Sequence, residues 1–243
     1  MQLFDKITVI IPTHERHKYL ERVLNYYSGA TFRIIVGDST KTAFSNQNKL
    51  KNIEYYHMPN IPFVEKLNKL FKKVETPYTV VCADDDFITL TGLFESVKFL
   101  DENEDYVCAT GRIETFIKDK DFSYRWFPDP DKDSHISIDH NNAAFRFLKY
   151  FSNYITPTFY AVTKTRILKI VFKKTSQLKI SIDPRFEELL SALLTVISGK
   201  FKFIDVSYQY RELLTTSGGQ TIPHIIDFIY DGSFDKKYGE FKR

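Results

Sequence analysis

Runs typical of buried strands alternate with runs of helical periodicity through the first 110 residues, and this alternation restricts the fold more than any other feature. Apolar and β-branched residues dominate the strand-like runs, which lie at 6–12, 32–40, 52–58 and 77–83. Apolar residues recur at helical spacing in the other runs, which lie at 18–27, 63–74 and 92–103. Because each strand is then buried between helices, the alternation predicts an α/β fold with a mostly parallel sheet covered on both faces.

The run at 63–74 has the clearest amphipathic pattern. Its predicted buried stripe consists of Phe63, Val64, Leu67, Leu70, Phe71 and Val74. Its predicted solvent face carries Glu65, Lys66, Lys69 and Lys73. We therefore expect this helix to pack one apolar face against the sheet and to leave its charged residues in water.

The second half of the chain is less regular. One or two strands are predicted at 105–117, a strand at 200–211, and helices at 143–151 and 184–199. The polar stretch 118–142, which holds Trp126, is predicted to be a long loop or an irregular hairpin. The lysine-rich stretch 172–179 is interpreted as a solvated face, and the Ser-Gly-Gly stretch 213–224 as a mobile loop.

Composition narrows the class of protein. Hydrophobic residues make up 43% and charged residues 27%, which is typical of a soluble globular chain, and a net charge of +3 is too small to favour a nucleic acid partner. Cys82 and Cys108 lie in apolar runs, which predicts buried free thiols in a reducing compartment. No apolar run approaches the ~18–20 residues of a membrane span and the N-terminus lacks a signal-peptide layout, so we expect a cytoplasmic protein.

Three polar clusters follow predicted strands: "PTHER" at 12–16, "GDST" at 37–40 and "DDD" at 84–86. Ligands of open α/β sheets bind beyond the carboxyl ends of the strands, so we expect the three clusters to meet at one edge of the sheet. Asp84 and Asp86 are alternate residues, and their side chains point the same way in an extended chain. Such an oxygen-rich pair suits Mg²⁺ or Mn²⁺; the alternative is a solvated acidic turn.

Four segments carry a family resemblance: "ITVIIPTHERHKYLERVL", "IIVGDST", "EKLNKLFKKVETPYTVVCADDDF" and, later, "FEELLSALL". Together they resemble the family 2 glycosyltransferases, which have the GT-A fold. The resemblance covers residues 6–112 and, more loosely, 180–212. It implies one GT-A domain in which 1–112 bind the nucleotide, 113–212 bind the acceptor, and 213–243 form a lid and tail.

The resemblance also assigns roles to individual residues. It implies nucleotide binding by Pro12, Thr13, His14, Arg16, Asp38, Asn68, Asp84 and Asp85. The acidic motif would hold a divalent metal, Mn²⁺ or Mg²⁺, with Asp86 as the direct ligand and Asp84 reaching the ribose or a metal-bound water. The sequence departs from the family at two positions, because the family usually has an aromatic residue in place of His14 and asparagine in place of Glu15.

Sugar transfer also needs a general base for the acceptor hydroxyl. The resemblance places that base at the start of a late helix, where "DPRFEELL" offers Glu187 and Glu188. We expect Glu188 to be the base, with Glu187 as its neighbour. The alternative is that both carboxylates only stabilise the helix, through their attraction to the positive end of the helix dipole.

The expected function is therefore metal-assisted, inverting transfer of a sugar from a UDP- or GDP-linked donor to a carbohydrate or glycolipid acceptor, in polysaccharide or glycoconjugate biosynthesis. The inner membrane surface is an alternative location. Two alternative functions stay open: a nucleotidyltransferase that makes sugar nucleotides, against which the absence of a "GxGxR" loop counts, and a non-catalytic nucleotide- or carbohydrate-binding module. Trp126 and Phe127 are candidates for stacking on a sugar ring, and His224 for a metal ligand.

Overall fold

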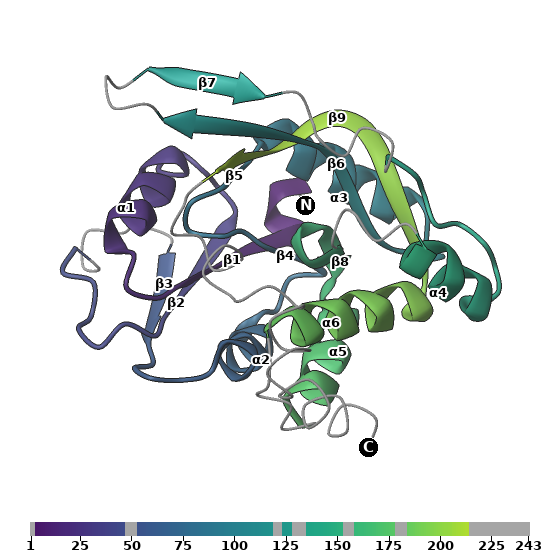
Figure 1. Ribbon diagram of the computed structural model, residues 1–243, viewed down its shortest axis with the longest axis horizontal. Helices are drawn as coiled ribbons and strands as arrows, with labels where there is room; N and C mark the ends of the chain where they lie inside the picture. Colours follow the sequence, from purple (N-terminus) through teal and green to yellow (C-terminus); the bar gives the residue numbers. More distant parts are fainter. Residues whose placement is uncertain are drawn as a thin grey trace, which may run out of the picture.

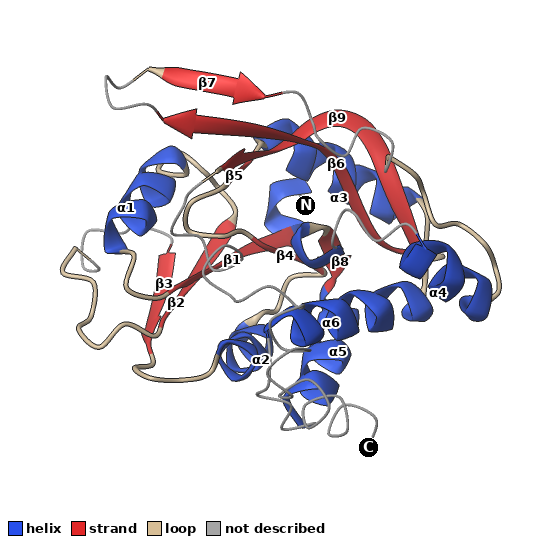
Figure 2. Ribbon diagram, viewed as in Figure 1, coloured by secondary structure: helices blue, strands red, loops and turns tan. Residues whose placement is uncertain are grey.

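The computed structural model describes residues 3–46, 53–118, 123–127, 135–152, 158–177 and 184–213. Within them, nine strands form one sheet with the order β3-β2-β1-β4-β8-β6-β9-β5, and β7 pairs with β6 beside this path (Figure 1). Helices flank the sheet on both sides (Figure 2). This arrangement confirms the predicted α/β fold.

The first half of the chain forms the parallel part of the sheet. Its strands are β1 (Ile7–Thr13), β2 (Arg33–Asp38), β3 (Ile53–His57) and β4 (Tyr78–Val81), and all their mutual pairings are parallel. Its helices are η1 (Leu3–Lys6), α1 (His17–Tyr26), α2 (Phe63–Lys73) and α3 (Leu90–Glu102). Since all four strands run the same way, their carboxyl ends meet at one edge, as the sequence predicts.

The second half extends the sheet with strands of both directions. They are β5 (Phe87–Ile88), β6 (Tyr106–Lys118), β7 (Tyr124–Phe127), β8 (Val162–Lys164) and β9 (Lys200–Glu212). Strands β6 and β9 are parallel, whereas β8 pairs antiparallel with both β4 and β6. The helical elements are α4 (Ala143–Ser152), η4 (Thr158–Tyr160), α5 (Thr165–Gln177) and α6 (Pro184–Ser198).

Two apolar cores lie on opposite faces of the sheet. Alternate residues of β1 face opposite cores. Val9 packs in the core beneath α1 and α3, and Ile10 packs in the core beneath α2, α4, α5 and α6. Cys82 and Cys108 are buried free thiols in these cores, as predicted. Within the described residues, no helix is both long and apolar enough to cross a bilayer.

Helix α2 packs very closely on the carboxyl end of β2. A Cβ atom added to Gly37 would lie 2.4 Å from Cδ1 of Leu70, so a larger residue at position 37 would require the side chain of Leu70 to shift. The prediction for this helix was wrong at two residues: Lys66 is buried, with 2% of its surface exposed, and Phe63 is 41% exposed. Lys66 reaches the ends of β1 and β2, where its ammonium contacts Thr13 and Ser39.

The stretch 172–179 was also misinterpreted. Its described part belongs to α5, in which Phe172 and Thr175 are buried while Lys173 and Lys174 are exposed. The lysines obscured the apolar stripe, which begins upstream at Ile167. By contrast, the alternative of an irregular hairpin at 118–142 is confirmed where it is described, because β7 pairs antiparallel with β6.

Candidate functional site

Three polar segments meet at the carboxyl ends of β1, β2 and β4. Thr13 is the register partner of Asp38 on the neighbouring strand, and its hydroxyl donates a hydrogen bond of 2.7 Å to Oδ2 of Asp84. All three side chains are buried. The parallel sheet thus brings together residues that lie up to 71 positions apart in the chain, as the sequence predicts.

A sharp turn follows β1 and shapes this edge. Glu15 adopts a left-handed backbone conformation with φ of 55°, which asparagine tolerates better than glutamate. The backbone N–H of Glu15 donates to the hydroxyl of Thr40 at 2.8 Å, which ties the turn to the segment after β2. His14, directly before the turn, is exposed at the surface of the site.

Asp38 is fully buried and organises the end of β2. Its carboxylate accepts hydrogen bonds from the backbone N–H of Thr40 (2.8 Å) and the hydroxyl of Tyr55 (2.5 Å), and it lies 2.7 Å from Nε2 of His17. Burial alone would raise the pKa of Asp38, but the hydrogen bonds from Thr40, Tyr55 and His17 outweigh it, and the pKa is lowered. Asp38 therefore stays ionised and holds three neighbouring segments in place.

The acidic segment after β4 is buried rather than solvated, so the alternative of a solvated turn was wrong. Asp84, Asp85 and Asp86 expose only 3%, 6% and 4% of their surface. Arg16 lies 2.5 Å from Asp85 and 3.4 Å from Asp84, while Asp86 accepts a hydrogen bond of 2.7 Å from Nε2 of Gln209. Burial raises the pKa of Asp84 to about 6 and that of Asp86 to about 7.

The residues of this segment fit part of a divalent-metal site. Asp84 and Asp86 supply hard oxygen ligands, and Oε1 of Gln209 is a buried acceptor without a hydrogen-bond partner beside Asp86. Among the described residues no group of three or more His, Cys, Asp or Glu side chains could hold a metal ion. A metal here would therefore need oxygen ligands from a bound substrate as well.

Lys66 belongs to this site, although the sequence predicted it to face solvent. Its ammonium donates to the carbonyl oxygen of Thr13 at 2.8 Å and to Oγ of Ser39 at 2.9 Å. Burial lowers the pKa of Lys66 to about 8, and the nearby charges of Asp38 and Asp84 oppose that shift. One feature of the sequence could have indicated that Lys66 is buried. Lys66 lies three residues after Phe63 and four before Leu70, which places it at the border of the apolar stripe of the helix.

Asn68, by contrast, lies away from this cluster. Its side-chain amide donates to Oγ of Ser176 on α5 at 3.0 Å, so it joins two helices in this structure. Pro12 lies within buried β1 as the register partner of Gly37. Its predicted contact with a nucleotide, like that of Asn68, stays a prediction.

Glu187 lies in the first turn of α6 and Glu188 directly after it, and both line a small cavity of about 70 Å³. The other lining residues are Phe63, Val64, Phe159, Tyr160 and Ser191. Tyr160 connects this cavity with the acidic segment: burial raises the pKa of its hydroxyl, Arg211 opposes the shift, and Asp86 and Glu188 both add to it. The charges of Glu188 and Asp86 therefore both favour the protonated form of the Tyr160 hydroxyl.

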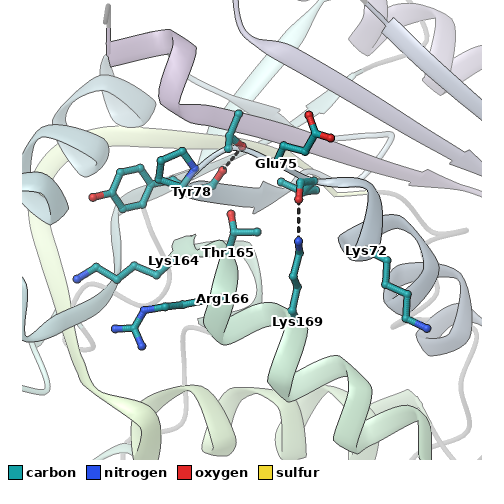
Figure 3. A pocket seen from close by; sticks show the side chains of 10 residues that line it. Lys72, Glu75, Tyr78, Lys164, Thr165, Arg166 and Lys169 are labelled. Atoms are coloured by element: carbon teal, nitrogen blue, oxygen red, sulfur yellow. Dashed lines mark hydrogen bonds between the residues drawn. The ribbon is translucent and has the colours of Figure 1, made fainter.

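A second cavity, of about 560 Å³, opens at the amino end of β4 (Figure 3). Lys164, Arg166 and Lys169 line it, and Lys169 reaches across to donate to the carbonyl oxygen of Val74 at 2.8 Å. It contains none of the predicted site residues and lies at the opposite edge of the sheet from Asp84. This cavity is therefore separate from the polar cluster.

The remaining candidates lie elsewhere. Trp126 is 58% exposed on β7, where its ring contacts Phe116 and Tyr210, and Phe127 is 37% exposed on the same strand. His224 lies outside the described residues, as does the predicted lid and tail beyond Leu213.

Comparisons with known proteins agree with this geometry. The fold is similar to that of S. aureus TarS 1-349. Its crystal structure matches with a TM-score of 0.60 and 17% sequence identity, and the match covers 85% of this chain and 60% of the TarS chain. The complex of the same protein with UDP-GlcNAc has a TM-score of 0.59 at 18% identity, covering 90% and 62%, and the complex with UDP has 0.53 at 19%, covering 86% and 61%. The chain thus spans about three fifths of these TarS 1-349 chains, and 37% of a further TarS chain that it matches.

No curated protein sequence matches the chain. The family model described as glycosyl transferase family 2 matches residues 8–174, which include most of β1, the acidic segment and most of α5. This match covers more than half of the chain. The chain therefore belongs to glycosyl transferase family 2 and has a GT-A fold.

Proposed function

We propose that this protein transfers a sugar, with inversion, from a UDP-linked donor to a hydroxyl of a carbohydrate or glycolipid acceptor. The observation that carries the proposal is the meeting of Thr13, Asp38 and Asp84 at the carboxyl ends of three parallel strands. Glu188 lines a cavity together with Tyr160. UDP and UDP-GlcNAc are the ligands of the similar TarS structures, which supports uridine as the first base to test.

The donor would bind along 1–112. Thr13, His14, Arg16 and Asp38 would hold the nucleoside, because they surround the ends of β1 and β2. Arg16 already lies against Asp84 and Asp85, where its guanidinium would also attract the diphosphate. Residues 113–212 would bind the acceptor and 213–243 would close over it.

A divalent ion, Mg²⁺ or Mn²⁺, would be held by Asp86 and Asp84 together with oxygens of the diphosphate. When bound, it would offset the negative charge that the diphosphate gains as its bond to the sugar breaks. Gln209 and Arg211 keep Asp86 oriented, at 2.7 Å and 3.6 Å from its Oδ2. The protein therefore supplies a preoriented carboxylate whose proton must leave before an ion binds.

Glu188 would act as the base. In one displacement, the acceptor oxygen forms a bond to the anomeric carbon, its proton passes to Glu188, and the nucleoside diphosphate leaves with the electron pair of the broken bond. Inversion follows because the attack comes from the side opposite the diphosphate. Glu187 would orient or repel its neighbour.

We place this reaction in the cytoplasm, in polysaccharide or glycoconjugate biosynthesis, because both cysteines are buried free thiols and nucleotide sugars are the donors. If the acceptor is a glycolipid, the protein would bind it at the inner surface of the membrane.

Calorimetric titration with UDP and with GDP, with and without Mn²⁺, tests donor binding. Release of UDP from UDP-GlcNAc in the presence of acceptor extracts, detected with anomeric NMR of the product, then tests transfer and inversion. Metal-dependent UDP binding together with an inverted product supports the proposal. Binding without turnover for any acceptor would support a non-catalytic module, and formation of a sugar nucleotide from a sugar phosphate would support a nucleotidyltransferase.

A further inference from the structure

The pocket at the amino end of β4 has a strongly basic lining. Four cationic side chains line it, those of Lys72, Lys164, Arg166 and Lys169, against one carboxylate, that of Glu75. In Figure 3, Lys164 and Arg166 lie on one side of the pocket and Lys72 on the other, with Lys169 between them. The lining alone therefore carries the same net charge, +3, as the whole chain.

The carboxylates around this pocket already have basic partners that do not line it. Three such ion pairs surround the pocket: Glu75 with Arg33 at 3.8 Å, Asp101 with Lys6 at 2.5 Å, and Asp105 with Lys200 at 2.5 Å. Within the described residues, neither Lys72 nor Arg166 has an ion-pair partner. The positive charge of the lining is therefore not balanced by the protein itself.

The two half-buried lysines of the pocket keep hydrogen-bond donors for a ligand. Lys164 donates to the carbonyl oxygen of Glu104 at 2.7 Å, and Lys169 donates to that of Val74 at 2.8 Å. An ammonium has three N–H donors, so each lysine uses one in these contacts and has two left for a ligand. Burial and the neighbouring charge of Arg166 lower the pKa of Lys164. An anion between the two side chains would offset their repulsion.

The shape of the pocket and the start of α5 add to this chemistry. Thr165, the first residue of α5, lines the pocket, so the positive end of the helix dipole lies there. The cavity of about 560 Å³ is larger than a single small anion needs, and Val74, Pro77 and Tyr78 give it an apolar wall. It therefore fits phosphoryl groups carried on a larger body better than a free ion.

We propose that this pocket is a second ligand site, which binds a phosphoryl-bearing anion at the edge of the sheet opposite Asp84. The guanidinium of Arg166 would contact two phosphoryl oxygens at once, and the three lysines would supply single N–H donors. Soluble phosphorylated compounds and lipid headgroups both carry this group. The inference is independent of the proposed function, because the pocket shares no residue with the predicted donor and acceptor sites.

Calorimetry with inorganic tripolyphosphate, in the absence of divalent metal, tests the site on the full chain. The wild type should bind it, and Lys164→Gln/Arg166→Gln should bind it at least about tenfold more weakly. Lys98→Gln/Lys202→Gln is the matched control, because it removes the same charge near α3, on the opposite face of the sheet. This control should bind like the wild type, and UDP affinity with Mn²⁺ should be the same in all three proteins.

Sedimentation with phosphatidylcholine vesicles, with and without phosphatidylglycerol, distinguishes the two sources of the phosphoryl group. Binding to phosphatidylglycerol vesicles that tripolyphosphate displaces, and that is lost in Lys164→Gln/Arg166→Gln, would identify a lipid headgroup as the ligand. Tripolyphosphate binding without vesicle binding would identify a soluble phosphorylated compound.

Three results would overturn the inference. They are a wild type that binds neither probe, equal binding by the wild type and Lys164→Gln/Arg166→Gln, and equal losses in this variant and its control. If the double variant does not fold, Arg166→Gln decides the question, because Arg166 is exposed and has no ion-pair partner within the described residues. Failure of the wild type to bind UDP would contradict the proposed function alone and leave the tripolyphosphate result standing.

Discussion

The hydroxyl of Thr13 donates a hydrogen bond of 2.7 Å to Asp84, and this contact joins the last residue of β1 to the acidic segment that follows β4. The carbonyl oxygen of the same Thr13 accepts from buried Lys66. One residue therefore touches the acidic motif with its side chain and the buried cation with its backbone. The geometry of the site depends on this junction.

Thr13→Val should weaken that junction while keeping the shape of the side chain. The Asp84 carboxylate loses a hydrogen bond that lowers its pKa, so its pKa should rise further above about 6. We expect the free energy of unfolding to fall by about 1 kcal/mol, measured by urea denaturation, and metal-dependent UDP affinity to fall with it. Thr13→Ser, which keeps the hydroxyl, should restore both; affinity that is unchanged in Thr13→Val would contradict a role for the junction.

The stability of the metal-free protein should fall as the pH rises from about 4 to 7.5. Burial raises the pKa of Asp86 to about 7 and that of Asp84 to about 6, from an ordinary value of 3.8. The folded state therefore holds protons that the unfolded state has released, and this contribution is complete below about 3.8 and lost as the pH passes 7. Asp86→Asn should flatten the dependence, in contrast to the exposed control Glu102→Gln. A profile that is the same in Asp86→Asn and the wild type would count against the raised pKa.

Lys66→Met should leave the fold at least as stable as the wild type at pH 7. Burial lowers the pKa of Lys66 from 10.5 to about 8, so the charged form opposes folding below pH 8, by roughly 3 kcal/mol at about 1.4 kcal/mol per pKa unit. The two lost hydrogen bonds offset part of the gain. Because the wild type recovers that free energy as the pH rises from 8 to 10.5, the advantage of the variant should shrink there. Urea denaturation of the wild type and Lys66→Met at pH 7 and pH 10 measures the difference in stability at each pH. A large loss of stability in the variant at pH 7 would show that Lys66 stabilises the folded state.

Asp38→Asn should raise the KM for the donor more than it lowers kcat. Asparagine offers one acceptor where the carboxylate now holds His17, Tyr55 and Thr40, so the edge of the site would lose its order. Tyr55→Phe removes one of these hydrogen bonds and should have a smaller effect in the same direction. Steady-state kinetics with UDP-GlcNAc measures both, and an equal loss in kcat with KM unchanged would instead place Asp38 in the chemical step.

Glu188→Gln should lower turnover by about 10²–10⁴-fold with donor binding intact, because glutamine cannot accept the proton of the acceptor. Glu187→Gln should cost less, since side chains of consecutive residues on a helix point about 100° apart and only one of the two can face the anomeric carbon directly. Single-turnover kinetics with calorimetric donor titration distinguishes the two variants. If Glu187→Gln is the inactive one, the roles are exchanged.

Much of the fold could be predicted from the sequence because its signals are local. The β-branched run ending at Thr13, the amphipathic pattern of 63–74 and the aspartates after Val81 each indicate their element without reference to the rest of the chain. Parallel pairing then obliges their carboxyl ends to share an edge, so the meeting of Thr13, Asp38 and Asp84 followed from topology alone.

Tertiary structure decided what lies between those residues. Periodicity places Lys66 at the border of the apolar stripe of the helix. Only the packing of α2 against the sheet brings its ammonium to the ends of β1 and β2, where a carbonyl oxygen and a hydroxyl replace water as hydrogen-bond partners. Likewise, the sequence left a solvated acidic turn open as an alternative, whereas the structure buries the three aspartates. Arg16 and Gln209, which are 69 and 123 positions from their partners Asp85 and Asp86, offset the cost of that burial. Such compensation depends on distances between remote residues, which a local pattern does not contain.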